Sequence, residues 1–396
     1  MDHCDQRLPN ELLLLIIHQC ADDKPTLCAL SKINKFFHSE CEPLCYRDIS
    51  SHCHRFHASL FFKGLPQNPQ FAKYITRFDC SNLNVMIDTL SRSIMSRLVD
   101  MVNLEDLGLL CNRDTEYQEA MKPFIGMKIK PRVSNLKRLR LRRREPYYCP
   151  AVDERWWGEF VRSQADTLEE LDLAEAMTWA LYPREGDKYL RYDNLRVLKG
   201  HWKVILGFLP RRRVRVVDLS SPIEDLVPLP NIVKELSGLE GFSTRCAYQG
   251  EQQRLLRSIV ERLDCIKYLG ITCKISDISS GVNLVQALPK TGIESLQTIT
   301  IIWSEQWKAD RSHYEPIDDN KFFPFFKMCP SLRFIDIELP YGMGPDPMGR
   351  PLLSSYHRIE CIVPGQIYRY RFYSFASSAV FKTSRIVRLH RTFYYE

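Results

Sequence analysis

The residues of this chain with the greatest capacity for chemistry are cysteines and histidines that gather near its N-terminus. Six of the 14 cysteines and six of the 10 histidines fall within the first 57 residues. Cys41 and Cys45 are four positions apart, as are Cys53 and His57, and similar spacings occur among the ligands of tetrahedral zinc sites. The alternative is that the cysteines pack as small apolar side chains while the histidines are solvated. We favour the alternative, and predict neither a metal nor a cofactor.

Sequence signatures of catalysis are absent. The chain has no Gly-x-Ser-x-Gly turn, no Gly-x-x-x-x-Gly-Lys loop, no Gly-x-Gly-x-x-Gly and no His-Glu-x-x-His. Only 17 of the 396 residues are glycine, which disfavours phosphate-binding loops. Cys53 with His54 or His57 could form a nucleophile and base, but proximity in sequence does not provide the geometry. We therefore predict a protein that binds rather than catalyses.

A second group of chemically suggestive residues is cationic. Five arginines occur in the seven residues from Arg138 to Arg144, and the first of them alternate with leucines, as on one face of a strand. Arginine contacts phosphate through two hydrogen bonds, so this row could bind an acidic or phosphorylated segment of a protein substrate. It could instead form an internal lattice of ion pairs with acidic residues on neighbouring strands. The residues predicted to share this sheet face, for either role, are Arg138, Arg140, Arg142, Glu170, Asp172, Lys199 and Asp218.

A repeating pattern supplies the strands that would position these side chains. The form Leu-x-x-Leu-x-Leu starts at Leu104, Leu136 and Leu168. Ten starts between residues 75 and 332 have a mean spacing of about 29 residues, within the range of leucine-rich repeats. Looser copies start at Ile75, Leu195, Val214, Leu239, Ile266, Leu296 and Leu332.

Helical spacing of apolar residues lies between several of these strands. Examples are Leu90, Ile94 and Leu98, then Trp157, Phe160 and Val161, then Leu255 to Leu263. Strands of one sense with helices between them build a parallel sheet, and units that cannot bury their apolar faces alone stack into a solenoid. The predicted fold class is α/β, an irregular solenoid with a curved parallel sheet and outer helices.

The first fifty residues carry more apolar side chains than a short helical unit can bury. All six residues from Leu12 to Ile17 are apolar, although a helix needs an apolar stripe of only about 100°. After Pro25, apolar residues recur with helical spacing at Leu27, Leu30, Ile33 and Phe37. Either the rest of the chain or another protein must cover the excess.

The same segment resembles an F-box in a form common in fungal proteins. Leu8 to Leu12 matches the opening Leu-Pro-x-Glu-Leu, Leu30 to Phe37 resembles the second signature, and Cys41 to Ile49 resembles Pro-Leu-x-Tyr-Arg-x-Ile. Many family members have Trp where this chain has Phe36 or Phe37. The resemblance implies a small all-α unit that docks on the Skp adaptor of a cullin–RING ubiquitin ligase. The predicted docking residues, some of which must form the unit's own core, are Leu8, Pro9, Leu12, Ile16, Leu27, Leu30, Ile33, Phe36 and Phe37.

The later repeats resemble leucine-rich repeats, although only one copy keeps the usual asparagine, at Asn112. An F-box followed by such repeats resembles the substrate receptors of SCF-type ligases. The predicted organisation is F-box helices over 1–50, a connector over 51–70, a substrate-binding solenoid over 71–340 and a basic aromatic cap or tail over 341–396. The resemblance implies binding to the Skp adaptor and the cullin scaffold, and to an unknown protein substrate. A rival is a scaffold without a ligase, whose N-terminal helices only cap the solenoid and are covered by residues 60–110.

The C-terminal segment carries most of the excess positive charge. From residue 350 to the end there are eight Lys and Arg against two acidic residues, whereas the whole chain has a net charge of +7. Tyr368, Tyr370 and Phe372 alternate with Arg369 and Arg371, which predicts a strand. Such interleaving could bind single-stranded nucleic acid, but a terminal cap of the solenoid is the favoured interpretation.

The expected location is the cytoplasm or the nucleus. The start of the chain has no pattern of a cleavable signal, and no apolar stretch approaches the roughly 18 residues that span a bilayer. No Asn-x-Ser/Thr sequon occurs, and the cysteines show no regular disulfide framework. We therefore expect free thiols and no membrane partner.

Overall fold

A computed structural model gives the architecture of the chain in two compact units, Met1–Leu168 and Glu169–Glu396, which are described separately. The structure describes residues 8–50, 68–79, 98–111, 135–143, 160–173, 192–201, 204–205, 208, 213–222, 236, 238–246, 261, 263, 265–273, 294–303, 326–327, 329–339, 353–363 and 367–376.

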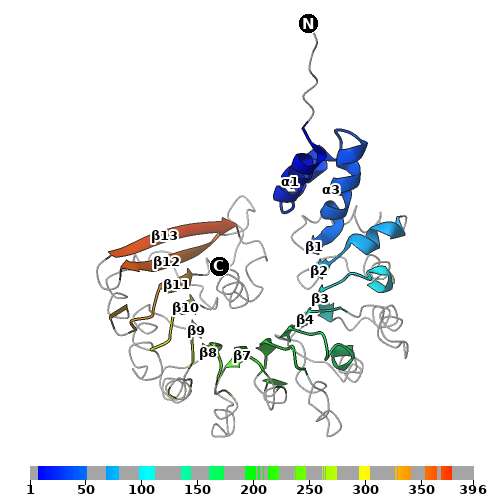
Figure 1. Cartoon of the computed structure of the whole chain (residues 1–396). Coiled ribbons are helices and arrows are strands. Elements are labelled where there is room, and N and C mark those ends of the chain that lie inside the picture. Colours follow the sequence, from blue (N-terminus) through cyan, green and yellow to red (C-terminus); the bar gives the residue numbers. More distant parts are fainter. Residues whose placement is uncertain are drawn as a thin grey trace, which may run out of the picture. The chain divides into compact units, whose positions relative to one another are not determined.

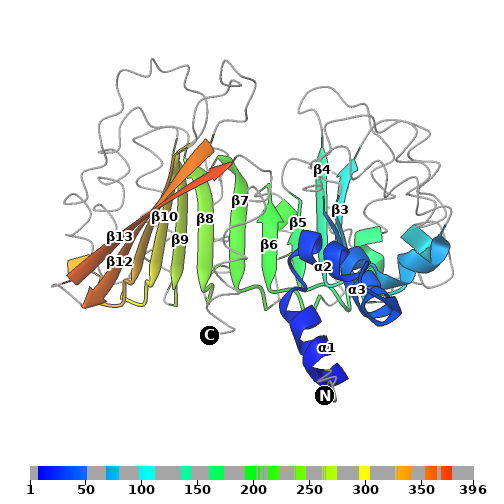
Figure 2. The same ribbon diagram turned by 90° about the horizontal axis from the view of Figure 1, so that it is seen from above.

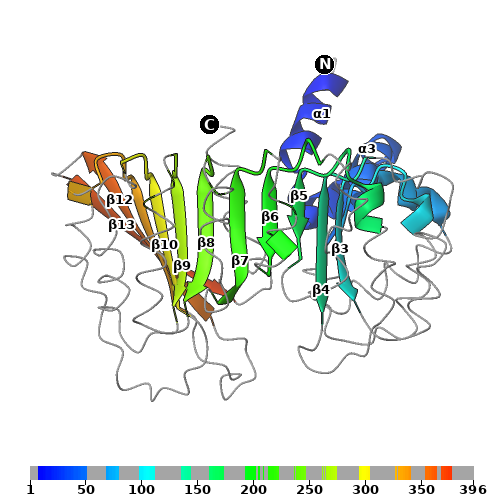
Figure 3. The same cartoon turned by 90° about the horizontal axis from the view of Figure 1, so that it is seen from below.

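The first unit begins with three helices and continues as a parallel sheet. The helices are α1 (Asn10–Gln19), α2 (Lys24–Leu30) and α3 (Lys35–Arg47). The strands β1 (Asp48–Ser50), β2 (Arg77–Asp79), β3 (Asp106–Cys111) and β4 (Arg138–Arg143) pair in chain order. Two 3₁₀ helices, η1 (Pro69–Tyr74) and η2 (Leu98–Asp100), precede β2 and β3. Figure 1 shows the three helices ahead of β1, and Figure 3 shows β3 and β4 side by side.

The second unit continues the same pattern of successive strands. Seven parallel strands pair in chain order, and two longer antiparallel strands follow (Figure 2). They are β5 (Glu170–Asp172), β6 (Val197–Gly200), β7 (Val216–Pro222), β8 (Gly241–Cys246), β9 (Tyr268–Cys273), β10 (Thr298–Trp303), β11 (Phe334–Leu339), β12 (Leu353–Val363) and β13 (Ile367–Ala376). Parallel strands that succeed one another in chain order are the arrangement of a repeat solenoid, so this coarse part of the predicted fold class is confirmed.

The repeat pattern located the strands closely. Each of the ten predicted starts lies two residues before a strand, from Ile75 before β2 to Leu332 before β11. The alternation also holds, because Leu139 and Leu141 of β4 are fully buried on the core side, as are Leu107 and Leu109 of β3. The hydrophobic period therefore fixed both the position of each strand and the face that it buries.

A recurring pair of backbone hydrogen bonds joins neighbouring repeats. It involves main-chain groups only, so it does not require the asparagine of the leucine-rich repeat motif, which most copies lack. The carbonyl of Thr76, just before β2, accepts hydrogen bonds from the amides of Glu105 and Asp106, at 2.8 and 3.0 Å. Glu105 accepts in the same way from Lys137 and Arg138. Six carbonyls of the second unit accept such a pair from the next repeat: those of Glu169, Arg196, Arg215, Glu240, Lys267 and Gln297. The turns before these strands are thus held by main-chain groups.

The sequence analysis did not anticipate β1. Residues 1–50 were expected to be helical, yet Asp48–Ser50 pair in parallel with Arg77–Asp79. Ile49 is buried and lies opposite the buried Phe78, so it takes the place of a repeat leucine. The sheet therefore starts within the segment 1–50, before the predicted connector over 51–70.

Few of the predicted outer helices fall within the described residues. Residues 160–163 are helical, with Phe160 and Val161 buried as expected, and Leu98 is buried in η2. Trp157, Leu90, Ile94 and most of the helix predicted over 255–263 lie outside the described residues. The strand predicted around Tyr370 is confirmed as β13, which pairs with β12 at the end of the sheet.

Candidate protein-binding surfaces

The N-terminal helices are set by local sequence signals. The Asp23 side chain caps α2 by accepting hydrogen bonds from the Thr26 amide (3.2 Å) and hydroxyl (2.7 Å). The Asn34 side chain caps α3 by accepting from the Phe37 amide at 3.0 Å. Only Ser31 to Asn34 lie between α2 and α3, and the two helices pack against one another.

These helices have a small core of their own. Ile17 of α1, Leu27 of α2 and Cys41 of α3 are buried together. The partly buried side chains packed against them are Cys20, Leu30, Phe36, Phe37, Leu44 and Cys45. Phe36 and Phe37 meet edge to face, with ring centroids 5.8 Å apart. Four of the predicted docking residues, namely Leu27, Leu30, Phe36 and Phe37, therefore belong to this core.

Other apolar side chains in these helices or beside their ends remain in solvent. Their exposed fractions run from 44% for Ile16 to 60% for Ile33. Leu12, Leu15 and Ile16 have the spacing of one helix face, opposite the buried Ile17. We call the following residues the exposed apolar set: Leu8, Leu12, Leu15, Ile16 and Ile33. Pro9 is also exposed, and Leu15 is the one member that the sequence analysis did not select.

The helices are joined tightly to the sheet of the first unit. Arg47 ends α3 and Asp48 begins β1, with no residue between them. The ring of Tyr46 stacks on Phe71 of η1 at a centroid distance of 4.2 Å. Burial, followed by the negative charge of Glu42, raises the pKa of Tyr46. The ammonium group of Lys24 donates to the Asp48 carbonyl, which ties the start of α2 to the same strand.

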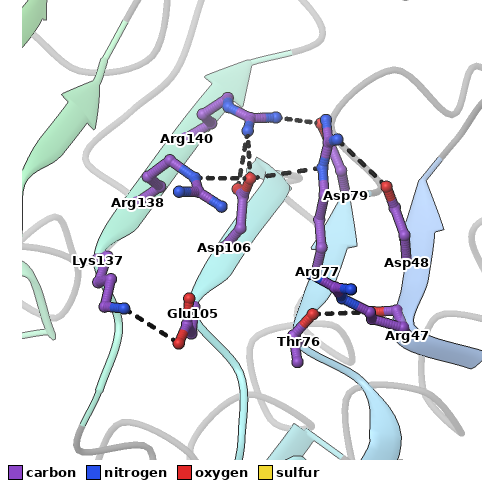
Figure 4. A network of polar contacts seen from close by, with 10 residues as sticks. All are labelled: Arg47, Asp48, Thr76, Arg77, Asp79, Glu105, Asp106, Lys137, Arg138 and Arg140. Carbon is purple, nitrogen blue, oxygen red and sulfur yellow. Dashed lines mark hydrogen bonds and ion pairs between the residues drawn. The ribbon is translucent and has the colours of Figure 1, made fainter. Parts of the chain in front are cut away.

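A row of alternating charges crosses the sheet that these helices join. Asp48, Arg77, Asp106 and Arg138 lie opposite one another on β1, β2, β3 and β4. Arg77 lies 3.3 Å from the Asp48 carboxylate and 3.4 Å from that of Asp106. Arg138 Nε donates to Asp106 at 3.0 Å, as Figure 4 shows. Cross-strand neighbours of opposite sign stabilise the pairing of the strands.

A second row lies one pleat further along the same face. Arg140 Nη1 donates to Asp79 Oδ2 at 2.5 Å, and Nη2 donates to both oxygens of Asp106 at 2.8 Å (Figure 4). Gly108 lies between Asp79 and Arg140 in the register, and a Cβ atom there would collide with the Asp79 carboxylate. Because Gly108 has no side chain, the Arg140 guanidinium can extend across β3 to Asp79. We call the following residues the charge ladder: Asp48, Arg77, Asp79, Asp106, Arg138 and Arg140.

The charge ladder provides acidic partners for Arg138 and Arg140, two of the residues predicted either to bind a substrate or to form internal ion pairs. Three arginines face three aspartates, so the ladder has no net charge, and Arg140 with its two aspartates is buried. Arg138 and Arg140 thus form the internal lattice of ion pairs. The members not predicted from the sequence are Asp48, Arg77, Asp79 and Asp106, although the last three lie at strand positions equivalent to those of the predicted arginines.

The remaining predicted binding residues lie on β4 and in the second unit. Arg142 is in β4, but its side chain lies outside the described residues. Glu170 and Asp172 of β5 are buried. Lys199 of β6 pairs with Asp218 of β7 at 3.2 Å, so the second unit also contains a cross-strand ion pair.

The described residues contain no group of three or more His, Cys, Asp or Glu side chains arranged to hold a metal ion. Cys41 and Cys45 lie in α3, whereas Cys53 and His57 fall outside the described residues. Seven cysteines that the structure describes are free. No helix within the described ranges combines the length and the apolar character needed to cross a bilayer.

Comparison of the chain with protein-family models and with curated proteins finds no match.

Proposed function

We propose that this chain is a non-catalytic substrate adaptor of an SCF-type cullin–RING ubiquitin ligase, in the cytoplasm or nucleus. Its N-terminal helices, as an F-box, would dock on the Skp adaptor, and its repeats would hold a protein substrate. The observation that carries the proposal is the exposed apolar set on helices that already possess their own core. The order of motifs from Leu8 to Ile49 supplies the resemblance to the F-box.

The exposed apolar set is costly unless a partner covers it. Five large side chains about half exposed would each gain about 1 kcal/mol from complete burial, which is on the order of 5 kcal/mol in total. Apolar side chains that gather on a surface mark sites of protein interaction, and Leu12, Leu15 and Ile16 share one face of α1. Docking of another protein on α1 and on the turn between α2 and α3 would recover this free energy.

The rival function is that of a scaffold whose helices only cap the solenoid. It expects residues 60–110 to cover the apolar excess of the helices. Leu12, Leu15, Ile16 and Ile33 nevertheless stay exposed, which favours a separate partner. The junction of α3 with β1 is compatible with both functions, because a cap and a docking module would each need to be fixed to the first repeat.

In this proposal the repeats bind the substrate, but no particular residues of the repeats are assigned to that contact. The ion pairs of Arg138, Arg140, Lys199 and Asp218 favour a structural role for these residues. An acidic or phosphorylated substrate would have to displace carboxylates that are already in place, at a cost in desolvation. The mechanism of such an adaptor is proximity, which raises the effective concentration of substrate lysines near the charged ubiquitin carrier.

Co-purification of the full chain with the Skp adaptor tests the proposal. The variant Leu12→Ser/Leu15→Ser/Ile16→Ser changes exposed side chains only and should stay folded, as judged by circular dichroism. Its matched control is Val102→Ser, which removes an exposed apolar side chain elsewhere in the first unit. The parent and the control should bind the adaptor in equal amounts, and the triple variant should lose binding. Failure of the folded parent to bind would support the scaffold instead.

A further inference from the structure

Two cysteines on neighbouring helices of the N-terminal unit face each other. Cys28 of α2 and Cys45 of α3 have Sγ atoms 4.0 Å apart, although 17 positions separate them in the chain. Cys28 is exposed, whereas Cys45 is partly buried against the core of Ile17, Leu27 and Cys41. Neither thiol belongs to the exposed apolar set, so their contact is independent of the proposed function.

The groups around the pair make the two thiols unequal. Burial, and then the neighbouring Cys28, raises the pKa of Cys45 to about 12. Lys24 acts on Cys45 in the opposite direction, but more weakly. The pKa of Cys41 is raised as well, mainly by burial and then by the neighbouring Cys20 and Cys28. The exposed Cys28 is the thiol of this group that a reagent in solution meets first, because reaction requires access.

We propose that Cys28 and Cys45 form a reversible thiol–disulfide site that reacts with small disulfides such as oxidised glutathione. The Cys28 thiolate attacks one sulfur of the reagent, so that a mixed disulfide forms and one glutathione thiolate leaves. Cys45 then attacks the Cys28 sulfur and displaces the second glutathione, which takes up the Cys45 proton. Two protein thiols are oxidised to one disulfide, and one oxidised glutathione is reduced to two thiols.

The second step is helped by the first. Once Cys28 carries glutathione, it can no longer become an anion, so one cause of the raised pKa of Cys45 disappears. The two sulfurs must approach by about 2 Å to reach the bond length of a disulfide. Rotation of the exposed Cys28 side chain is the smallest movement that could provide this approach.

The disulfide would tie α2 to α3 on either side of the turn that carries Ile33. The chain between the two sulfurs includes the whole turn, so its local unfolding would be restricted. Amide exchange between residues 28 and 45 should slow on the order of tenfold or more in the oxidised chain. Oxidation would thus fix the helical unit without covering its exposed apolar side chains.

Peptide mapping of the full, folded chain tests this site. The reduced protein is incubated with oxidised glutathione, free thiols are blocked with an alkylating reagent, and the cysteine peptides are identified by mass spectrometry. We expect a peptide in which Cys28 is linked to Cys45 and which dithiothreitol separates. Cys265, which is exposed in the second unit, serves as an internal control and should carry one glutathione.

Two variants distinguish the roles of the thiols. In Cys45→Ser, Cys28 should keep its glutathione, whereas in Cys28→Ser the Cys45 thiol should remain free. Peptide mapping of the parent chain is sufficient to test the Cys28–Cys45 disulfide, so the test does not depend on the folding of either variant. The proposal would be overturned if Cys28 of the parent stably carried glutathione beside a free Cys45. It would also be overturned if Cys28 became linked to Cys20 or Cys41.

Discussion

Replacement of Arg140 by methionine should be among the most destabilising changes in the first unit. The Arg140 side chain is 6% exposed, and the carboxylates of Asp79 and Asp106 that it contacts are each 2% exposed. Methionine keeps much of the length but removes the charge and three hydrogen bonds. Loss of one partner leaves buried carboxylates with less compensation, which typically costs about 3–5 kcal/mol.

Two nearby residues provide matched controls: Arg138 lies on the same strand, and Lys137 directly precedes that strand. Arg138 is 23% exposed and makes one hydrogen bond with Asp106, at 3.0 Å, so Arg138→Met should cost about 1–2 kcal/mol. Lys137 pairs with Glu105 at 3.1 Å, with both side chains about 40% exposed, so Lys137→Met should cost about 0–1 kcal/mol. The expected order of destabilisation is therefore Arg140, then Arg138, then Lys137.

Urea unfolding, followed by circular dichroism and by amide exchange of β3 and β4, measures the three free-energy changes. Amide exchange within these strands reports on the first unit alone, whereas the urea transition followed by circular dichroism includes both units. Added salt should reduce the small effect of Lys137→Met and leave that of Arg140→Met nearly unchanged, because buried charges are poorly screened. If Arg140→Met cost no more than Lys137→Met, the charge ladder would not stabilise this sheet as argued.

Three further predictions concern single side chains. Asn34→Ala should destabilise the start of α3 by about 1 kcal/mol through loss of the cap, measurable as faster amide exchange there. Hydrogen bonds from the Thr26 side chain and amide lower the pKa of Asp23 below 3.8, so this cap acts fully above pH 3.8 and is lost as the pH falls through the lower folded-state value. The difference in melting temperature between the parent and Asp23→Ala should therefore shrink as the pH is lowered from about 5 to about 2, and a constant difference would contradict it. Burial raises the pKa of Cys329 to about 11, so iodoacetamide at neutral pH should modify the exposed Cys265 much faster than Cys329; equal rates would contradict the burial.

The strands could be located from the sequence because their signal is local. Each repeat carries apolar residues at fixed positions, and Leu136, Leu139 and Leu141 must all face the core for β4 to pack. The partners of the polar side chains could not be located in this way. Arg140 and Asp79 are 61 positions apart and meet only because β3 presents Gly108 between them. Such a contact depends on the register of three strands, which no single repeat encodes.

The sequence could not show which N-terminal apolar residues are buried and which are exposed, for a related reason. The run from Leu12 to Ile17 is apolar on all sides of the helix, so its period does not reveal an inner face. The packing of α1 against Leu27 and Cys41 selects Ile17 for the core and leaves Leu15 and Ile16 outside. The apolar spacing indicated helices near Asn10 and after Pro25, but only tertiary packing distinguishes core residues from candidate contacts.

The junction between α3 and β1 fixes the helices to the sheet of the first unit, a property that the proposed adaptor function would use. Because β1 follows α3 directly, the expected connector over 51–70 does not separate the helices from the sheet. Asp48 joins the two parts, since its carbonyl accepts from Lys24 of α2 and its carboxylate pairs with Arg77 of β2. A protein bound to α1 would therefore be held at a fixed orientation to the first strands. Fixed geometry favours transfer by proximity more than a flexible tether would, because less orientational freedom is lost when the reacting groups meet.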